Sequence, residues 1–173
     1  MKNFMKINIV VKSSLLALLL LGPNVMASQS SIEWSNPEKF TDIDASNESK
    51  RHFKKRLFAS FEKHFTKLGE QLPAGYSWKI KITDLDLAGT VSNKFSPSLG
   101  EMRIIDDWFR PQITFSYEVL NAQGKVVAAA DEHRLRENLI ERFPGRSFMR
   151  KEFSYEKHMI KKWFKKSLLP QLG

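Results

Sequence analysis

Two aspartates near the middle of the chain have a spacing that suits carboxylate chemistry. Asp84 and Asp86 are two positions apart, so a regular strand would direct both side chains to the same face of a sheet. Such a pair could help to bind a hard cation such as calcium, with Asp42 and Asp44 as further oxygen ligands. The chain has no calcium-loop pattern, and we therefore expect Asp84 and Asp86 to accept backbone amide hydrogen bonds at a bulge or turn. Asp42, Asp84 and Asp86 form a candidate polar site of unknown role, and we predict no metal there.

Other catalytic and metal-binding patterns are absent from the sequence. The chain has no cysteine, which excludes thiol catalysis, disulfides and cysteine zinc sites. It has neither a nucleophile elbow nor a glycine-rich phosphate loop. The histidines lack the spacing of a zinc-protease helix, and we expect all of them to be solvated: His52, His64, His133 and His158. A glycosidase needs only two separated carboxylates, and the candidates for that role are Glu38, Asp42, Asp84 and Asp86. We predict no catalytic residues and no cofactor, and favour a protein that is not an enzyme.

A segment late in the chain interleaves cations with aromatic rings. Its cations are Arg142, Arg146, Arg150 and Lys151, and its aromatic residues are Phe143 and Phe148. Such a segment could bind an anionic glycan or lipid, with the cations supplying charge and the rings supplying sugar or acyl contacts. Alternatively, it is a surface loop that its phenylalanines anchor to the core.

The charge of the chain favours an anionic partner. The chain has 28 Lys and Arg against 19 Asp and Glu, a formal net charge of +9. Much of the excess lies in residues 50–67 and 134–166. A basic balance attracts anions, although the same lysines would also occur on the solvated outer faces of helices.

The first 27 residues predict export. Residues 1–12 carry three lysines and no acid, residues 13–21 are mainly apolar, and residues 25–27 read Val-Met-Ala. A basic region, a short apolar stretch and a small-x-small end are typical of a secretory signal, and the apolar run is too short for a spanning helix. We expect cleavage after Ala27, one mature domain at 28–173, no membrane span after cleavage, and a periplasmic or secreted location. Outside the cytoplasm, anionic lipid, glycan or an envelope protein is a more plausible partner than nucleic acid.

The hydrophobic pattern predicts an α+β domain. Apolar alternation indicates strands near Ile32, Ile80, Ile104, Phe115 and Val127. Apolar stripes indicate one helix that begins near Ser46–Asn47 and ends at Gly69, and another that begins at Ser154. We expect a mainly antiparallel sheet of four or five strands, covered on one face by these two amphipathic helices. Because the apolar parity changes within residues 76–89, we also expect a bulge near Thr83–Asp84.

Four blocks of sequence resemble one exported bacterial family, the domain of unknown function 3016. In chain order they are residues 36–42, Asn-Pro-Glu-Lys-Phe-Thr-Asp; residues 84–89, Asp-Leu-Asp-Leu-Ala-Gly; Arg110-Pro111 before residues 113–117; and residues 155–164. The resemblance covers nearly all of the mature chain. It implies an exported protein with a small mixed fold, and it supplies no catalytic residue, substrate or cofactor. Two hypotheses of function remain: a non-catalytic module that binds an anionic envelope component or protein partner, or an uncharacterised hydrolase of an envelope polymer.

Overall fold

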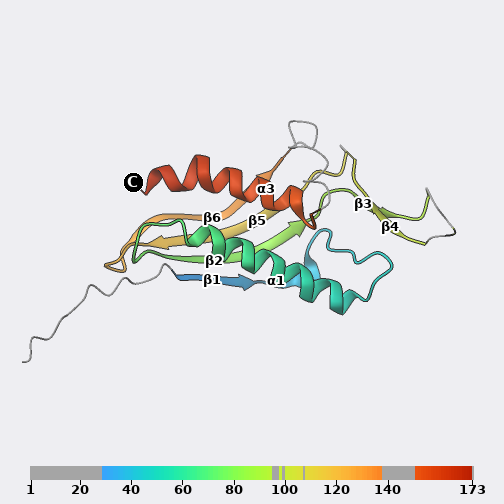
Figure 1. Ribbon diagram of the computed structural model, residues 1–173, viewed down its shortest axis with the longest axis horizontal. Coiled ribbons are helices and arrows are strands. Elements are labelled where there is room, and N and C mark those ends of the chain that lie inside the picture. The colour runs from blue at the N-terminus through green and yellow to red at the C-terminus, as the bar shows by residue number, and fades with distance from the viewer. Residues whose placement is uncertain (1–28, 95–97, 99, 107, 138–150, 173) are drawn as a thin grey trace, which may run out of the picture.

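The computed structural model describes residues 29–94, 98, 100–106, 108–137 and 151–172 of the chain, and these form an α+β structure (Figure 1). The strands are β1 (Gln29–Trp34), β2 (Ser77–Asp86), β3 (Thr90–Ser92), β4 (Met102–Ile104), β5 (Gln112–Leu120) and β6 (Val126–Arg136). The helices are the 3-10 turn η1 (Pro37–Lys39), α1 (Lys50–Gly69), α3 (Ser154–Trp163), the π-helical turn η3 (Phe164–Leu168) and the 3-10 turn η4 (Leu169–Gln171). The predicted fold class is confirmed.

The main sheet is mixed, in the order β1-β2-β5-β6. Strands β2, β5 and β6 pair antiparallel, as expected, but β1 runs parallel to β2, with Ile32 opposite Ile80. A parallel pair needs a long crossover, and here the connection between β1 and β2 contains α1. The prediction was wrong about Ile104, which lies in β4 and pairs with β3 in a separate two-stranded sheet.

The change of apolar parity in β2 is explained by a bulge. Trp78, Ile80 and Ile82 face the core, and the pairing with β5 then shifts between Ile82 and Asp84. The extra residue returns Leu85 to the buried face, where it is fully enclosed. The predicted bulge at Thr83–Asp84 is therefore confirmed.

Helix α1 packs on the sheet through the predicted stripe of Phe53, Leu57, Phe61, Phe65 and Leu68, all of which are buried. Its start differs from the prediction, because the helix begins at Lys50 and not near residues 46–47. Those two polar side chains bind elsewhere. The Ser46 hydroxyl donates to the carbonyl of Glu101, and the Asn47 carbonyl oxygen accepts the Glu101 amide at 3.0 Å. They join the α1 approach to the chain just before β4.

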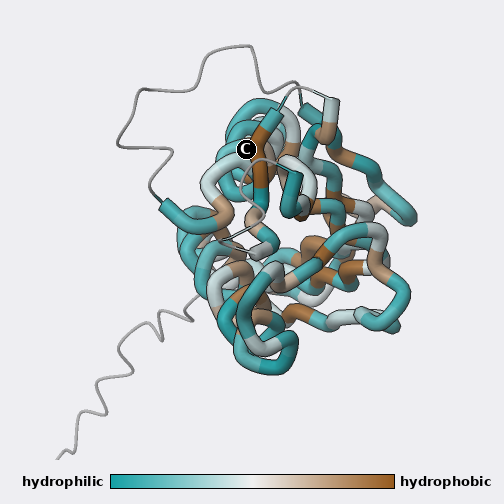
Figure 2. Tube along the Cα trace, turned by 90° about the vertical axis from the view of Figure 1, so that its right-hand side faces the viewer, coloured by the Kyte–Doolittle hydropathy of each residue, from teal (hydrophilic) through white to brown (hydrophobic). Residues whose placement is uncertain are grey.

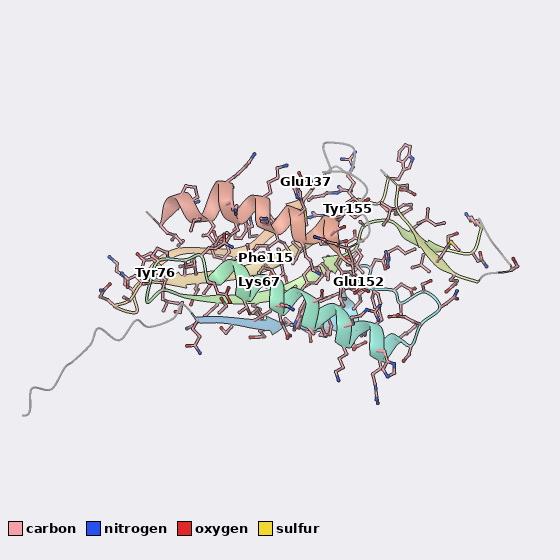
Figure 3. All side chains as sticks on the ribbon, viewed as in Figure 1. Lys67, Tyr76, Phe115, Glu137, Glu152 and Tyr155 are labelled. Carbon is pink, nitrogen blue, oxygen red and sulfur yellow. The ribbon has the colours of Figure 1, made fainter. Side chains whose placement is uncertain are left out.

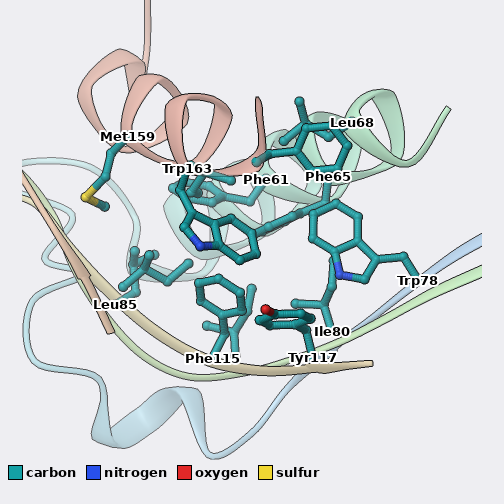
Figure 4. Packing of buried hydrophobic residues seen from close by; sticks show 14 of the residues in the cluster. Phe61, Phe65, Leu68, Trp78, Ile80, Leu85, Phe115, Tyr117, Met159 and Trp163 are labelled. Atoms are coloured by element: carbon teal, nitrogen blue, oxygen red, sulfur yellow. The ribbon is translucent and has the colours of Figure 1, made fainter. Parts of the chain in front are cut away.

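Helix α3 completes the core from the same side of the sheet as α1 (Figure 1). Trp163 extends from α3 onto the sheet, with its ring centroid 5.1 Å from that of Phe115 and 5.2 Å from that of Tyr117 (Figure 4). On α1, Phe65 packs on Trp78 at 5.7 Å. Hydrophobic segments gather in the interior and hydrophilic segments at the periphery (Figure 2). Within the described part of the chain, no helix is long and apolar enough to cross a membrane.

Candidate functional site

The candidate aspartates meet where the chain after η1 lies beside the end of β2. Asp42 forms an isolated parallel bridge with Asp86: its amide donates to the Leu85 carbonyl at 3.2 Å, and its carbonyl accepts the Leu87 amide at 3.0 Å. Asp84 is held in the same place, because its two carboxylate oxygens accept the Thr41 amide at 2.7 Å and the Thr41 hydroxyl at 2.8 Å. The structure thus brings Asp42, Asp84 and Asp86 together from two segments.

Arg103, on β4, is the cation at the centre of this cluster. Its two terminal nitrogens donate to the two carboxylate oxygens of Asp42 at 2.9 and 3.0 Å, a bidentate ion pair. The guanidinium also donates to the carbonyls of Asp44 at 3.1 Å and Gly89 at 3.3 Å. One side chain therefore links the N-terminal segment, the end of β2 and the small hairpin. We name this arrangement the arginine latch: Asp42, Asp84, Asp86, Arg103 and Glu156.

Glu156 joins the latch from α3. Its carboxylate accepts the Ala88 amide at 2.7 Å, and its side chain is enclosed. Burial raises the pKa of Glu156, because an ionised carboxylate loses hydration there. Burial also raises the pKa of Asp86, with the nearby charges of Asp42 and Asp84 acting in the same direction.

The latch uses most of its polar groups internally. Asp42 binds Arg103, Asp84 binds Thr41, and Glu156 binds a backbone amide. A cavity of about 170 Å³ lies beside it, lined by Arg103 and Glu156 but by neither Asp84 nor Asp86. Such an arrangement fastens segments of chain together and does not present paired carboxylates to a substrate.

Arg103 and Glu156 were missed from the sequence. Nothing local marks Arg103, since its partner is 61 positions away. Glu156 had a usable signal, because it lies on the apolar stripe that Met159, Ile160 and Trp163 form at helical spacing. A charged residue on a buried helix face needs a partner, and its presence there predicts a specific polar contact.

Two of the four histidines correct the sequence expectation. His64 and His133 are only partly exposed, and the Nε2 atom of each is buried without a hydrogen-bond partner. The pKa of His64 is lowered to about 4, mainly by burial, with the charges of Lys157, Lys161 and Lys67 acting in the same direction. Among the described residues, no group of three or more potential metal ligands is found.

The two helices place a basic surface on one side of the molecule. We name it the basic helix layer: Lys50, Arg51, Lys54, Lys55, Arg56, Lys63 and Lys67 of α1, with Lys157, Lys161, Lys162, Lys165 and Lys166 of α3 and η3. Glu48, Glu38, Glu137 and Glu152 pair with three of these cations. The Lys157 ammonium on α3 donates to the Ser60 hydroxyl on α1 at 2.5 Å, so the two helices lie side by side. Two basic runs that are far apart in the sequence therefore lie on neighbouring helices; Lys67 is labelled in Figure 3.

The predicted aromatic-cationic segment lies mostly outside the described residues, which leaves out Arg142, Phe143, Arg146, Phe148 and Arg150. Lys151 is described. It is exposed, lies three residues before Ser154 at the start of α3, and lines the cavity beside the latch together with Ile105.

A group of exposed apolar residues follows β4. Trp108 is 87% exposed, Phe109 50% and Ile105 43%. The Asp106 carboxylate accepts the amides of Trp108 at 2.9 Å and Phe109 at 3.1 Å, which fixes the turn. The Gly89 amide donates to the Phe109 carbonyl at 2.8 Å, so the end of the Asp84–Gly89 motif is hydrogen-bonded to this group.

Comparison with known proteins places the chain in one family and gives no activity. A family model described as "protein of unknown function (DUF3016)" matches residues 28–166. No curated protein matches the chain, and no solved structure matches it. Because the family match spans all the strands, α1 and α3, the chain belongs to the DUF3016 family.

Proposed function

We propose that this protein is an exported, non-catalytic module of the cell envelope that binds an anionic component through its basic helix layer. The observation that supports the proposal is the gathering of twelve cations on the two helices, where α1 carries one acid and the acid of α3 is buried. Such a surface attracts polyanions over about a Debye length, roughly 10 Å at 0.1 M salt.

The opposite face of the sheet lacks this excess. There Lys81 lies 3.4 Å from Glu33, and Lys79 lies 4.0 Å from Glu118. The electrostatic attraction is therefore stronger on the helix side of the sheet, and an anionic partner would approach the helices first. Arg142, Arg146, Arg150 and Lys151, with Phe143 and Phe148, precede α3 along the chain, and their sequence makes them candidates for the same binding role.

A binding role is better supported than the hydrolase alternative. A glycosidase needs two carboxylates that face its substrate. Asp42 and Asp84 are occupied by Arg103 and Thr41. Export to the periplasm or medium rests on the signal pattern of residues 1–27, and mass spectrometry that finds Met1 retained on the protein in envelope fractions would contradict it.

Binding to a soluble polyanion, dextran sulfate, tests the charge argument. We expect the wild type to bind at low salt and to release as salt approaches 1 M, where the screening length falls to about 3 Å. The double variant Lys63→Gln with Lys67→Gln should bind more weakly. The matched control is Lys79→Gln with Lys81→Gln, which removes two charges from the sheet face and should retain binding. Equal losses in both variants, or no binding at low salt, would contradict the proposal.

The late segment has its own variant. Arg146→Glu with Arg150→Glu, in a protein whose circular dichroism is unchanged, should also weaken binding. Unchanged affinity would remove this segment from the proposed surface and leave the helices as the binding element.

A further inference from the structure

We propose that the anionic component is a lipid bilayer surface and that Trp108 and Phe109, which follow β4, insert into its headgroup region. This inference rests on the proposed function, because the basic helix layer supplies the long-range attraction. The turn supplies what charge alone cannot, an apolar contact that survives screening by salt.

The degree of exposure is the first argument. A packed tryptophan buries about 150–250 Å² of surface. Trp108 is 87% exposed, so moving its side chain out of water would be favourable. Phe109 and Ile105 are close to half exposed in the same short turn. Single exposed apolar residues are ordinary, but a local group with a tryptophan at its tip indicates an interaction site.

The rigidity of the turn is the second argument. Asp106 accepts two amides of the turn, and Gly89 holds its end. Gly89 has φ +81°, and a Cβ there would lie 2.1 Å from the Ile104 carbonyl oxygen, so glycine is needed for this approach. The arginine latch binds the Gly89 carbonyl from the other side. The backbone of Trp108 and Phe109 is thus held by hydrogen bonds to Asp106 and Gly89, which reduces the ordering entropy that insertion would cost.

The position of the turn is the third argument. Ile105 lines the same cavity as Lys151 and Tyr155, at the beginning of α3. The exposed turn therefore lies beside the first residues of one of the two basic helices, and Figure 3 labels Glu152 and Tyr155 at this start of α3. A surface that touches the turn can also meet cations of the basic helix layer. Apolar tips beside cations match a bilayer interface, where acyl chains lie under phosphate groups.

The chemistry of the turn favours lipid over sugar. Sugar sites combine an aromatic face with polar groups that bind hydroxyls. Here the Asp106 carboxylate is used on amides of its own turn. Tryptophan has an apolar body and one N–H donor, which suits the boundary between acyl chains and water.

The test compares vesicles with a soluble polyanion. Protein purified after export is mixed with vesicles of phosphatidylcholine containing phosphatidylglycerol, with vesicles of phosphatidylcholine alone, and with dextran sulfate. We expect binding to the anionic vesicles, and we expect Trp108→Ala to weaken that binding about tenfold while leaving dextran sulfate binding unchanged. Val126→Ala on β6, where the side chain is 46% exposed, is the matched control and should bind vesicles as the wild type does.

Depth of insertion gives an independent readout. Phosphatidylcholine brominated on its acyl chains should quench a tryptophan signal that disappears in Trp108→Ala, because Trp78 and Trp163 are in the core and the partly buried Trp34 packs on Phe58 of α1 at 4.3 Å. Binding to dextran sulfate without binding to vesicles would overturn the lipid assignment and leave the proposed function intact. Vesicle binding that is equal in Trp108→Ala and Val126→Ala, or an absence of quenching, would overturn the role of the turn. Absence of binding to every anionic probe would overturn both.

Discussion

Replacing Arg103 by methionine should destabilise the fold more than any loss of a surface ion pair would. Methionine keeps much of the length of the side chain but removes the five donors and the charge. The change leaves the carboxylate of Asp42 without its partner, and the side chains of Arg103 and Asp42 are only 19% and 25% exposed. It also removes the hydrogen bonds to the carbonyls of Asp44 and Gly89.

The magnitude follows from the degree of burial. Exposed ion pairs contribute about 0–1 kcal/mol, whereas breaking a buried pair costs about 3–5 kcal/mol. The Arg103–Asp42 pair lies between these limits, so we expect the free energy of unfolding to fall by about 2–3 kcal/mol. For a domain of this size that corresponds to a Tm lower by roughly 6–12 °C.

Urea unfolding monitored by circular dichroism measures the change, and a double-mutant cycle with Asp42→Asn assigns it. If the pair is the cause, adding Arg103→Met to Asp42→Asn should cost much less than it does alone. Lys79→Met is the control, because its partner Glu118 is 4.0 Å away and both side chains are exposed. Strict additivity of the two single changes, or a loss below about 0.5 kcal/mol for Arg103→Met, would refute the reasoning.

Three further predictions concern backbone and buried charge. Gly89→Ala should cost more than Gly124→Ala in urea unfolding, since both positions have positive φ but a Cβ at Gly89 meets a carbonyl oxygen and one at Gly124 meets nothing within 4 Å; equal costs would contradict this. Glu156 has a raised pKa in the fold, so its folded form binds more protons and stability falls as pH rises from the unfolded pKa through the folded one. Relative to wild type, Glu156→Gln should therefore gain stability as the pH rises above the ordinary value of 4.5, and a pH-independent difference would argue against the assignment. For His64 the folded pKa of about 4 lies below the unfolded value, so stability should be lost as pH falls from about 6.5 to 4, and NMR titration that finds the ring charged at pH 5.5 would disprove it.

The elements that sequence predicted best are those in which side-chain period and burial agree. The stripe of α1 and the alternation of β2 both follow from apolar residues that must face one core, and the parity change required a bulge. The start of α1 could not be predicted in the same way. Ser46 and Asn47 have the chemistry of helix caps, but their hydrogen bonds go to Glu101, 55 and 54 positions away. At these two residues, the local preference for capping a helix competes with long-range hydrogen bonds. Only the local preference can be recognised from a single sequence.

The arginine latch could likewise be predicted only in part from the sequence. Asp84 was expected to accept a backbone amide, and it does, but the amide belongs to Thr41 and not to its own turn. The parallel direction of β1 determines this outcome, because it carries residues 35–44 past the end of β2. The expectation of a mainly antiparallel sheet left the direction of the first strand open, so it could not bring Asp42 to Arg103.

The Asp84–Gly89 motif acts as a junction in which successive residues serve different partners. Leu85 and Leu87 enter the core, Asp84 holds the N-terminal segment, Ala88 binds α3 through Glu156, and Gly89 supports the exposed turn. This six-residue segment thus connects four parts of the fold, and the hydrogen bonds of Asp84 to Thr41 give that aspartate a structural role. A junction of this kind also fixes the apolar turn beside the start of a basic helix. This arrangement supports the proposed role, in which cations attract the protein to an anionic surface and aromatic side chains bind to it.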